Sequence, residues 1–518
     1  MHGSMITTSV QLGRTIRMQA GQVRGSPRDQ GGVLAFKGIP YAAPPIGPLR
    51  WRAPQPPMSC TGVRDALAFG AGSLSSLEND RRPGPRSEDC LTLNIWTAAK
   101  DSDEKRPVMV WIHGGGFQFG SSANPATDGH LLAAKGVVVV SFNYRLGVFG
   151  FLAHPDLDLD TQAQSGNFGL QDQLAALRWV KVNIAAFGGD PDNVTLFGES
   201  AGAMAVGILM ASPLARGLFH KAVCESGAFW DGRHGPLQSF DEARARGEAF
   251  ARRHGNGSIA TLRAMPADQL NAAASWSFER DHVTEAFSPS IDRYVVPDVP
   301  TRRFLRGEQM HIPLLAGWNS AEEFPFMSLA LSVHSAQAFR DAAAKVFGED
   351  RMAEFLKIYP AETDAQAAAS AAALTGDMVV GEQCWQALRL HRRSTRAPVY
   401  GYHFAYTSPY TPIASHVTEI PFVFGTLTPQ RVIGSTTPPA EADRTLAQTM
   451  MSYWSNFATS GDPNASGLPF WPAYDEADIV QILGASIEAR PNPQADRFRL
   501  LGSFREDGVL PMRWREVN

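Results

Sequence analysis

Residues 194–202 read VTLFGESAG, so that an apolar run is followed at once by Ser200, which stands between Gly198 and Gly202. If the chain turns sharply here from a strand into a helix, side chains at the two glycine positions would collide with neighbouring backbone. The turn would lift the serine hydroxyl above a sheet, and the first amides of the helix would point at it. The stretch therefore predicts a nucleophile elbow, a strained turn that presents a reactive serine.

The surroundings of this turn decide how specific the pattern is, because G-x-S-x-G also arises by chance in long chains. Residues 107–117 read PVMVWIHGGGF, an apolar run that ends in three glycines. A strand before the serine, a helix of small residues after it and a glycine-rich loop at the end of an earlier strand form the context that a nucleophile elbow requires.

The rest of the chain alternates between strand-like and helix-like patterns. Buried strands are predicted in the apolar runs that begin at residues 107 and 136, and at 194–197, 221–225, 313–316 and 399–404. A helix is predicted where apolar residues recur near helical spacing, at Leu170, Leu174, Leu177 and Ile184. The alternation predicts an α/β protein in which helices flank a large, mostly parallel central sheet.

We expect one domain over residues 1–518, since a chain of this length can bury a large core. Between about residues 241 and 374 the alternation weakens into helical sequence rich in Ala, Arg and Glu. A helical insertion beside a sheet predicts a cap or pocket wall. Residues 1–4, ahead of Met5, resemble a cloning remnant, with Met1 as the alternative natural start.

Charge and composition exclude several classes of function. The 47 basic and 51 acidic residues give a net charge of −4 without a long run of one sign, so nucleic acid is not an expected partner. Apolar stretches fall far short of the roughly 20 residues of a membrane span, and no signal peptide is evident, so we expect a cytoplasmic protein. The four cysteines lack the spacing of a metal site or a disulfide framework: Cys60, Cys90, Cys224 and Cys384.

A serine hydroxyl needs a base to take its proton and an acid to orient that base. In this architecture both follow the serine along the chain. Spacing alone does not choose among 13 histidines, but His416 lies in a polar loop after the predicted strand at 399–404. Two adjacent carboxylates, Glu322 and Glu323, follow the predicted strand at 313–316 in the loop GWNSAEEF. Either one is a candidate acid.

Several longer motifs extend over nearly the whole chain. They are FKGIPYAAPPIGPLRWRAP (36–54), SEDCLTLNIW (87–96), HGGGF (113–117), FNYRLGVFGFL (142–152), GNFGLQDQLAALRWVKVNIAAFGGDPDNVTLFGESAG (166–202) and WSNFATSGDPN (454–464). In these motifs and their order the chain resembles the type B carboxylesterase and cholinesterase family of α/β-hydrolases. The resemblance implies an α/β-hydrolase fold whose helical insertions cap a gorge-like active site.

The resemblance also implies a role for individual residues. Ser200 matches the nucleophile, His416 the base, and Glu322 the acid of a loop that reads Asp-Glu-Gly in the family. Here that loop reads Ala-Glu-Glu, so Glu323 replaces the glycine and stays an alternative. The backbone amides of three residues match the oxyanion hole: Gly115, Gly116 and Ala201.

Other matches are expected to bind substrate or to support the fold. Substrate contacts are predicted for Glu199 beside the nucleophile and for three aromatic residues that would wall an acyl or alcohol pocket: Trp230, Phe324 and Phe326. Arg50 with Glu88, and Arg145 with Asp172, resemble structural salt bridges of the family. Ser226 is similar to a buried serine behind the triad.

The chain departs from the cholinesterases in two places. Residues 73–86 contain no aromatic residue where cholinesterases carry the tryptophan that binds a quaternary ammonium, so a cation site by stacking is not expected. The family's first disulfide cysteine is replaced by Ser73, which leaves Cys90 without its usual partner. The loss agrees with a reducing cytoplasm.

Together these features predict a serine carboxylesterase that hydrolyses a small ester to acid and alcohol through an acyl-enzyme, without metal or cofactor. Amide, carbamate and lipid-ester hydrolysis stay open, because they share this route. The alternative from another class is a non-catalytic binding module like neuroligin, a family member that has lost the chemistry. We expect a monomer or small homo-oligomer.

Overall fold

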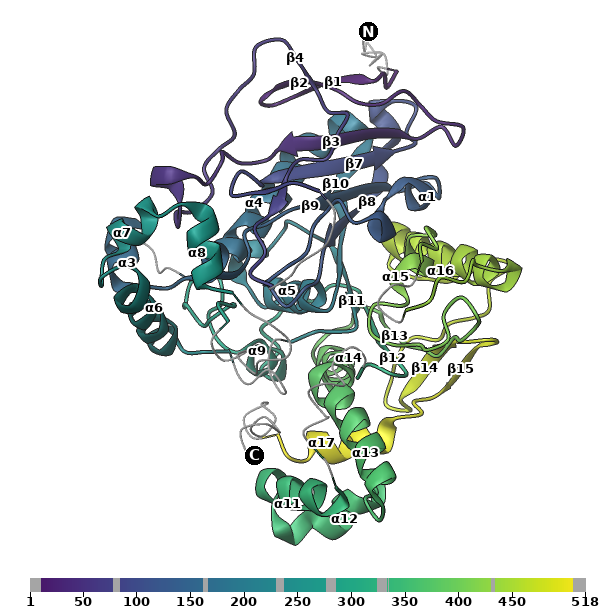
Figure 1. Ribbon diagram of the computed structural model, residues 1–518. Helices are drawn as coiled ribbons and strands as arrows, with labels where there is room; N and C mark the ends of the chain where they lie inside the picture. The colour runs from purple at the N-terminus through teal and green to yellow at the C-terminus, as the bar shows by residue number, and fades with distance from the viewer. Residues whose placement is uncertain are drawn as a thin grey trace.

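The structure, a computed structural model, describes residues 11–77, 84–161, 166–229, 237–275, 286–323, 333, 335–429 and 434–505. Its centre is a ten-stranded sheet in the order β15-β14-β13-β12-β11-β10-β8-β9-β7-β3 (Figure 1). The strands are β3 (Leu34–Pro40), β7 (Thr92–Thr97), β8 (Arg106–Ile112), β9 (Val138–Phe142), β10 (Gly189–Glu199), β11 (Lys221–Glu225), β12 (Leu314–Asn319), β13 (Val399–Phe404), β14 (Ile479–Leu483) and β15 (Ile487–Pro491).

The strands from β9 to β14 along this order pair in parallel, whereas β3, β7 and β15 add antiparallel edges. A smaller sheet joins β1 (Thr15–Met18), β2 (Gly21–Arg24) and β4 (Val63–Asp65), and β5 (Gly72–Ser73) pairs with β6 (Arg86–Ser87). All six predicted strands belong to the parallel part, so the mostly parallel α/β sheet is confirmed.

Helices cover both faces of the large sheet (Figure 1). The described α-helices are α1 (His130–Ala133), α2 (Gly147–Phe151), α3 (Pro155–Thr161), α4 (Phe168–Asn183), α5 (Ala201–Met210), α6 (Phe240–His254), α7 (Ile259–Ala264), α8 (Ala267–Ala273), α9 (Pro300–Leu305), α11 (Ala336–Phe347), α12 (Met352–Ile358), α13 (Asp364–Gly376), α14 (Glu382–Ser394), α15 (Ile420–Val423), α16 (Glu441–Ser460) and α17 (Ala495–Gly502). A π-helical turn at Asp377–Gly381 joins α13 to α14. Within the described residues, no helix has both the length and the apolarity that a bilayer crossing requires.

The apolar run of β8 is buried on both sides, because successive side chains of a strand point to opposite faces. Val108, Val110 and Ile112 join the hydrophobic cluster that includes α4 and α5. Met109 and Trp111 join the cluster formed with α15 and α16. A strand with two covered faces is held rigidly, so the loop that follows it begins at a fixed position.

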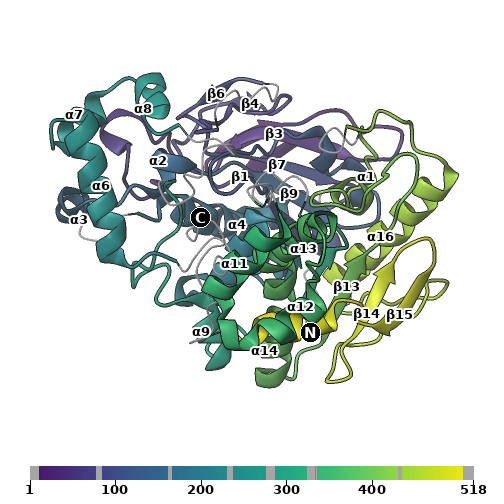
Figure 2. The same ribbon diagram turned by 60° about the horizontal axis from the view of Figure 1, so that its bottom comes forward.

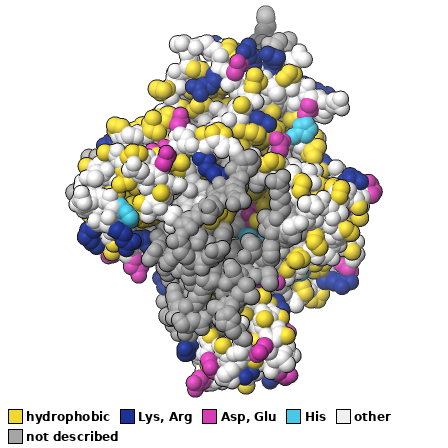
Figure 3. Space-filling view, in the orientation of Figure 1, with side chains coloured by type: hydrophobic (Ala, Val, Ile, Leu, Met, Phe, Trp, Pro, Cys, Tyr) yellow, Lys and Arg dark blue, Asp and Glu magenta, His cyan; other side chains and the backbone are white. Residues whose placement is uncertain are grey.

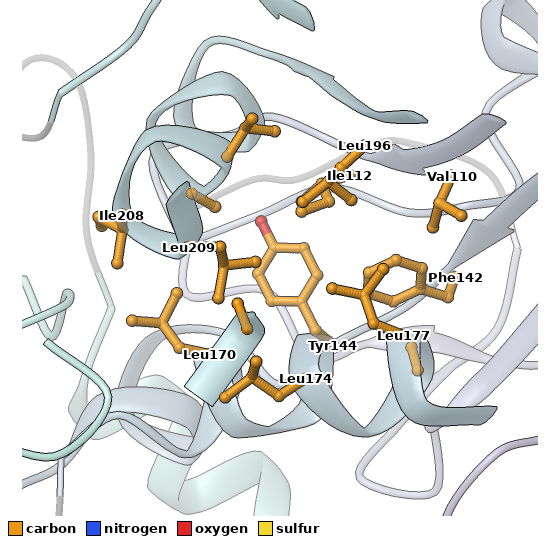
Figure 4. Packing of buried hydrophobic residues seen from close by; sticks show 14 of the residues in the cluster. Val110, Ile112, Phe142, Tyr144, Leu170, Leu174, Leu177, Leu196, Ile208 and Leu209 are labelled. Atoms are coloured by element: carbon orange, nitrogen blue, oxygen red, sulfur yellow. The ribbon is translucent and has the colours of Figure 1, made fainter. Parts of the chain in front are cut away.

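The first of these clusters is drawn in Figure 4, where side chains of α4, α5 and the sheet surround Tyr144. The helical contributors labelled there are Leu170, Leu174, Leu177, Ile208 and Leu209. The leucine spacing therefore predicted α4 correctly, and Ile184 begins a 3-10 turn directly after it. Full burial of each leucine stabilises the fold by about 1.5–3 kcal/mol.

The helical sequence between residues 241 and 374 forms two groups that lie apart, α6 to α8 and α11 to α13, with β12 between them in the chain (Figure 2). Arg50 holds the first group: its guanidinium donates to the carbonyls of Leu262, Arg263 and Met265 at the end of α7. The second group has its own hydrophobic cluster, which includes Leu500 and Leu501 of α17.

Candidate active site

The predicted turn is present at the centre of the large sheet. β10 ends at Glu199, α5 begins at Ala201, and Ser200 between them has φ 55° and ψ −126°. Such a backbone conformation costs a non-glycine residue about 1–3 kcal/mol and persists only where neighbours fix it. Here the Ser200 amide donates to the carbonyl of Glu225 on β11 (2.9 Å), and the Ser200 carbonyl accepts from the amide of Met204 (2.9 Å).

The flanking glycines are required by close approach, as the sequence predicted. A Cβ at position 202 would lie 2.1 Å from the carbonyl oxygen of Ile112, and one at position 198 would lie 2.7 Å from that same oxygen and from the carbonyl carbon of Gly202. Both obstacles are backbone atoms that cannot rotate away. The glycines thus let β10 and α5 close against the end of β8.

The glycine-rich loop that follows β8 runs directly beside the serine. A Cβ on Gly114 would lie 3.1 Å from Cβ of Ser200. Gly115 and Gly116 have positive φ values of 110° and 60°, which suit glycine. Within the described part of the chain, no group accepts a hydrogen bond from the amides of Gly115 and Gly116. Unsatisfied amides beside a hydroxyl are able to bind a negative oxygen.

The candidate base and acid meet at the ends of neighbouring strands. Nδ1 of His416 lies 2.7 Å from Oε2 of Glu322, and Oε1 of Glu322 accepts from the amide of Asn319 at 2.6 Å. The amide of Ala321 donates to the carbonyl of Ala414 (2.9 Å), which joins the two loops. Of the two adjacent carboxylates, the structure brings Glu322 to the histidine.

The other ring nitrogen of His416 faces the residue that precedes the serine. Its Nε2 lies 3.1 Å from Oε1 of Glu199, and both side chains are buried. Burial lowers the pKa of His416, but the charges of Glu199 and Glu322 outweigh it and raise that pKa to about 9. For Glu199, burial raises the pKa to about 8, although the charge of His416 acts in the opposite direction. Because the two groups are in contact, the protonation of one affects the pKa of the other.

Behind the histidine lies a buried polar network that the sequence analysis found only in part. Ser226, predicted as a supporting serine, donates to Oε1 of Glu419 (3.0 Å). Asn319 donates through Nδ2 to Oε2 of Glu419 and to the carbonyl of Ser415. Burial, followed by the charge of Glu322, raises the pKa of Glu419 to about 7. These contacts connect the loop of His416 to the ends of β11 and β12.

A fourth buried carboxylate, Glu225, accepts from Nε1 of Trp454 at 2.7 Å, and burial raises its pKa well above the ordinary value. Glu225, Asn319 and Glu419 were missed from the sequence. Glu225 and Asn319 could have been found from their position, since they end the parallel strands β11 and β12 as Glu199 ends β10. In open parallel sheets the carboxyl ends of the strands bound the ligand site.

The expected structural contacts are also formed. Arg50 binds Glu88 (2.5 Å), and Arg145 binds Asp172 (2.7 Å) with both side chains almost fully buried. All four cysteines are free thiols. The hydroxyl of Ser73, at the position of the family's disulfide cysteine, donates to the carbonyl of Tyr144 (2.5 Å). The predicted pocket residues lie outside the described residues: Trp230, Phe324 and Phe326.

Comparison with known proteins places this chain in a family. The model of the carboxylesterase family matches residues 13–498. The chain belongs to the carboxylesterase family. The α/β-hydrolase fold and the carboxylic ester hydrolase class predicted from the sequence are thereby confirmed.

Relatives and solved structures agree with this assignment. The chain is 38% identical to a fumonisin B1 esterase from Sphingopyxis macrogoltabida over 486 residues, covering 90% of this chain and 86% of the relative. It is 37% identical to a para-nitrobenzyl esterase from Bacillus subtilis (strain 168) over 499 residues, covering 93% and 97%. A PNB esterase structure (33% identity) and a Geobacillus stearothermophilus carboxylesterase structure (35%) both superpose with a TM-score of 0.81, covering 94% of this chain and 99% of theirs.

Proposed function

We propose that this carboxylesterase uses Ser200 as nucleophile, His416 as base and Glu322 as the orienting acid. The observation that carries the proposal is the 2.7 Å contact between Nδ1 of His416 and Glu322. The other ring nitrogen, Nε2, lies beside Glu199, the residue that precedes Ser200 in the turn. Donation of Nδ1–H to Glu322 fixes the tautomer whose Nε2 accepts a proton.

Ser200 then attacks the ester carbonyl, and its proton passes to His416 and on to the leaving alcohol. Water, activated by the same histidine, hydrolyses the acyl-enzyme. The negative oxygen of each tetrahedral intermediate is bound by the amides of Gly115, Gly116 and Ala201, where one donor contributes about 3 kcal/mol. Support for this assignment comes from the loop of Gly114, which runs beside the serine.

Glu199 has a second part in this scheme. Nε2 of His416 accepts a proton from Ser200 only after it has given up its own. Because burial raises the pKa of Glu199 to about 8, this carboxyl group is suited to take up the proton that leaves the imidazole. Oε1 of Glu199 lies 3.1 Å from Nε2 of His416, so this proton moves over a short path.

The substrate is proposed to be a small carboxylic ester. The relatives are named for different compounds, among them fumonisin B1, para-nitrobenzyl esters and cocaine, so the family does not fix the natural ester. We retain Trp230, Phe324 and Phe326 as proposed pocket residues. Rates on a panel of esters, varied separately in the acyl and alcohol parts, would define the preference and would show whether amides, carbamates or lipid esters also react.

The location and assembly remain proposals: a monomer or small homo-oligomer in the cytoplasm. The free thiols support a reducing compartment.

The deciding experiment compares the wild type with Ser200→Ala on p-nitrophenyl acetate and with a fluorescent organophosphate. We expect turnover and covalent labelling in the wild type and neither in the variant, with unchanged circular dichroism. Unchanged turnover in Ser200→Ala would refute the nucleophile. A wild type that neither turns over esters nor takes the label would support the neuroligin-like alternative.

A further inference from the structure

The amide of Gly116 owes its direction to the chain beyond it. The Gly115 carbonyl and the Gly116 N–H belong to one planar peptide unit and point in opposite directions. That carbonyl accepts from the backbone amides of Gln118 (2.9 Å) and Phe119 (3.1 Å). Whatever holds Gln118 in place therefore also aims the N–H of Gly116.

The side chain of Gln118 is anchored on three sides. Its Oε1 accepts from the hydroxyl of Ser76 at 2.7 Å. Its Nε2 donates to the carbonyl of Phe287 at 2.7 Å and, more weakly, to the carbonyl of Gly116 at 3.4 Å. The backbone carbonyl of Gln118 also accepts from the amide of Ser76 at 3.0 Å. Both the donor and the acceptor end of this amide are thus in use.

Burial makes this arrangement costly to disturb. Gln118 and Ser76 are each 2% exposed. A buried amide that loses its partners pays a desolvation penalty, so the side chain has one favoured position. Little room is left nearby, since a Cβ at Gly147 would lie 3.0 Å from Oγ of Ser76 and 3.3 Å from Oε1 of Gln118.

The two anchors come from distant parts of the chain. Ser76 follows β5, in a segment that α8 also holds through Asn271, whose Nδ2 donates to the carbonyl of Ser75 (2.7 Å). Phe287 packs its ring edge-on against Phe250 of α6, with centroids 5.2 Å apart. Gln118 therefore ties the glycine-rich loop to segments that rest on α6 and α8.

From these contacts we infer that Gln118 is a positioning residue that fixes the oxyanion-binding loop of Gly115 and Gly116. Glycines with positive φ are free to move unless neighbours hold them, and transition-state stabilisation requires donors that are already aimed. The inference rests on the proposed function, because it concerns the same oxyanion hole. It adds a residue that stabilises the transition state without touching the substrate.

The test compares Gln118→Leu and Gln118→Glu with the wild type. Leucine removes every polar contact at similar volume, and glutamate keeps the acceptor but loses both donated bonds. Removal of a whole oxyanion donor costs about 10²–10³ in kcat, so a loosened donor should lower kcat by about 10- to 100-fold while KM stays near the wild-type value. Ser76→Ala, which removes one anchor only, should show a smaller loss in the same direction.

A second readout separates positioning from general damage. A trifluoromethyl ketone adds to the serine and places its oxyanion in the hole, so its inhibition constant should rise by the same factor as kcat/KM falls. The matched control is Gln309→Leu: Gln309 is 3% exposed, donates to Ser394 (2.6 Å), and lies shortly before the amino end of β12, whereas the site lies at the carboxyl ends of the strands. We expect the control to lose stability without loss of kcat.

The inference is overturned if the Gln118 variants keep wild-type kcat, if only KM changes, or if Gln309→Leu loses kcat equally. If Gln118→Leu does not fold, Gln118→Glu and Ser76→Ala decide by the same criteria. Parallel assays of the wild type and Ser200→Ala separate the two proposals. An active Ser200→Ala would refute both, whereas an inactive Ser200→Ala beside fully active Gln118 variants would refute the positioning role alone.

Discussion

Replacement of Glu322 by glutamine tests the triad at its acid. Both carboxylate oxygens are committed, Oε2 to Nδ1 of His416 and Oε1 to the amide of Asn319. Glutamine offers one acceptor and one NH₂ group to these two partners. If the NH₂ faces Asn319, two donors oppose each other; if it faces His416, Nδ1 must give up its proton and Nε2 carries it instead. That tautomer cannot accept a proton from Ser200.

The size of the effect follows from this conflict and from the lost charge. In a serine protease the corresponding aspartate-to-asparagine change leaves the geometry intact and lowers kcat about 10⁴-fold. We therefore expect Glu322→Gln to lower kcat by about 10³–10⁴, equivalent to about 4–5.5 kcal/mol of transition-state stabilisation. KM should change little, because Glu322 is buried behind the histidine.

The assay is the steady-state hydrolysis of p-nitrophenyl acetate, with Glu323→Gln as the matched control. Glu323 is adjacent in sequence, and burial also raises its pKa, but the contact with His416 is made by Glu322. We expect Glu323→Gln to keep kcat close to wild type, and both variants to keep the wild-type thermal midpoint within a few degrees. An inactive Glu323→Gln beside an active Glu322→Gln would refute the assignment.

Two further predictions concern the elbow and the contact between Glu199 and His416. Gly202→Ala drives a Cβ into the carbonyl of Ile112 and should lower the free energy of unfolding by about 3 kcal/mol, whereas Gly13→Ala, with nothing within 4 Å, should cost almost nothing in urea denaturation. Equal stability of the two variants would contradict the close approach. Glu199→Gln removes a charge that raises the pKa of His416, so the ascending limb of kcat/KM against pH should move to lower pH by about 1 unit, and a limb that stays or moves up would contradict the pairing.

The sequence predicted the middle of the sheet better than its edges. The strands at 221–225 and 399–404 were placed with correct bounds, because continuous apolar runs between turn residues mark a strand with two covered faces. β10 begins five residues earlier than predicted, at Gly189, which pairs with Arg106 of β8 ahead of a register shift that extends to Val194, and composition does not reveal such backbone pairing. The outer strands β3, β7, β14 and β15 were not predicted.

The residues of the candidate site also divide into those that the sequence predicted and those that it did not. Ser200, His416 and Glu322 stand in motifs with a characteristic local pattern, and the structure brings Glu322 and His416 into contact. Gln118 and Glu419 have no such pattern. Their partners lie far along the chain, as in the bond from Ser226 to Glu419, and only the folded sheet brings them together.

The left-handed backbone of Ser200 has a consequence for how the chain evolves. Glycine adopts that conformation without steric penalty, so a chain with glycine at position 200 would be more stable than the natural one and would have no nucleophile. Selection for activity therefore favours serine at position 200, whereas selection for stability favours glycine. The packing of the core and the hydrogen bonds around the turn offset the strain that the serine brings.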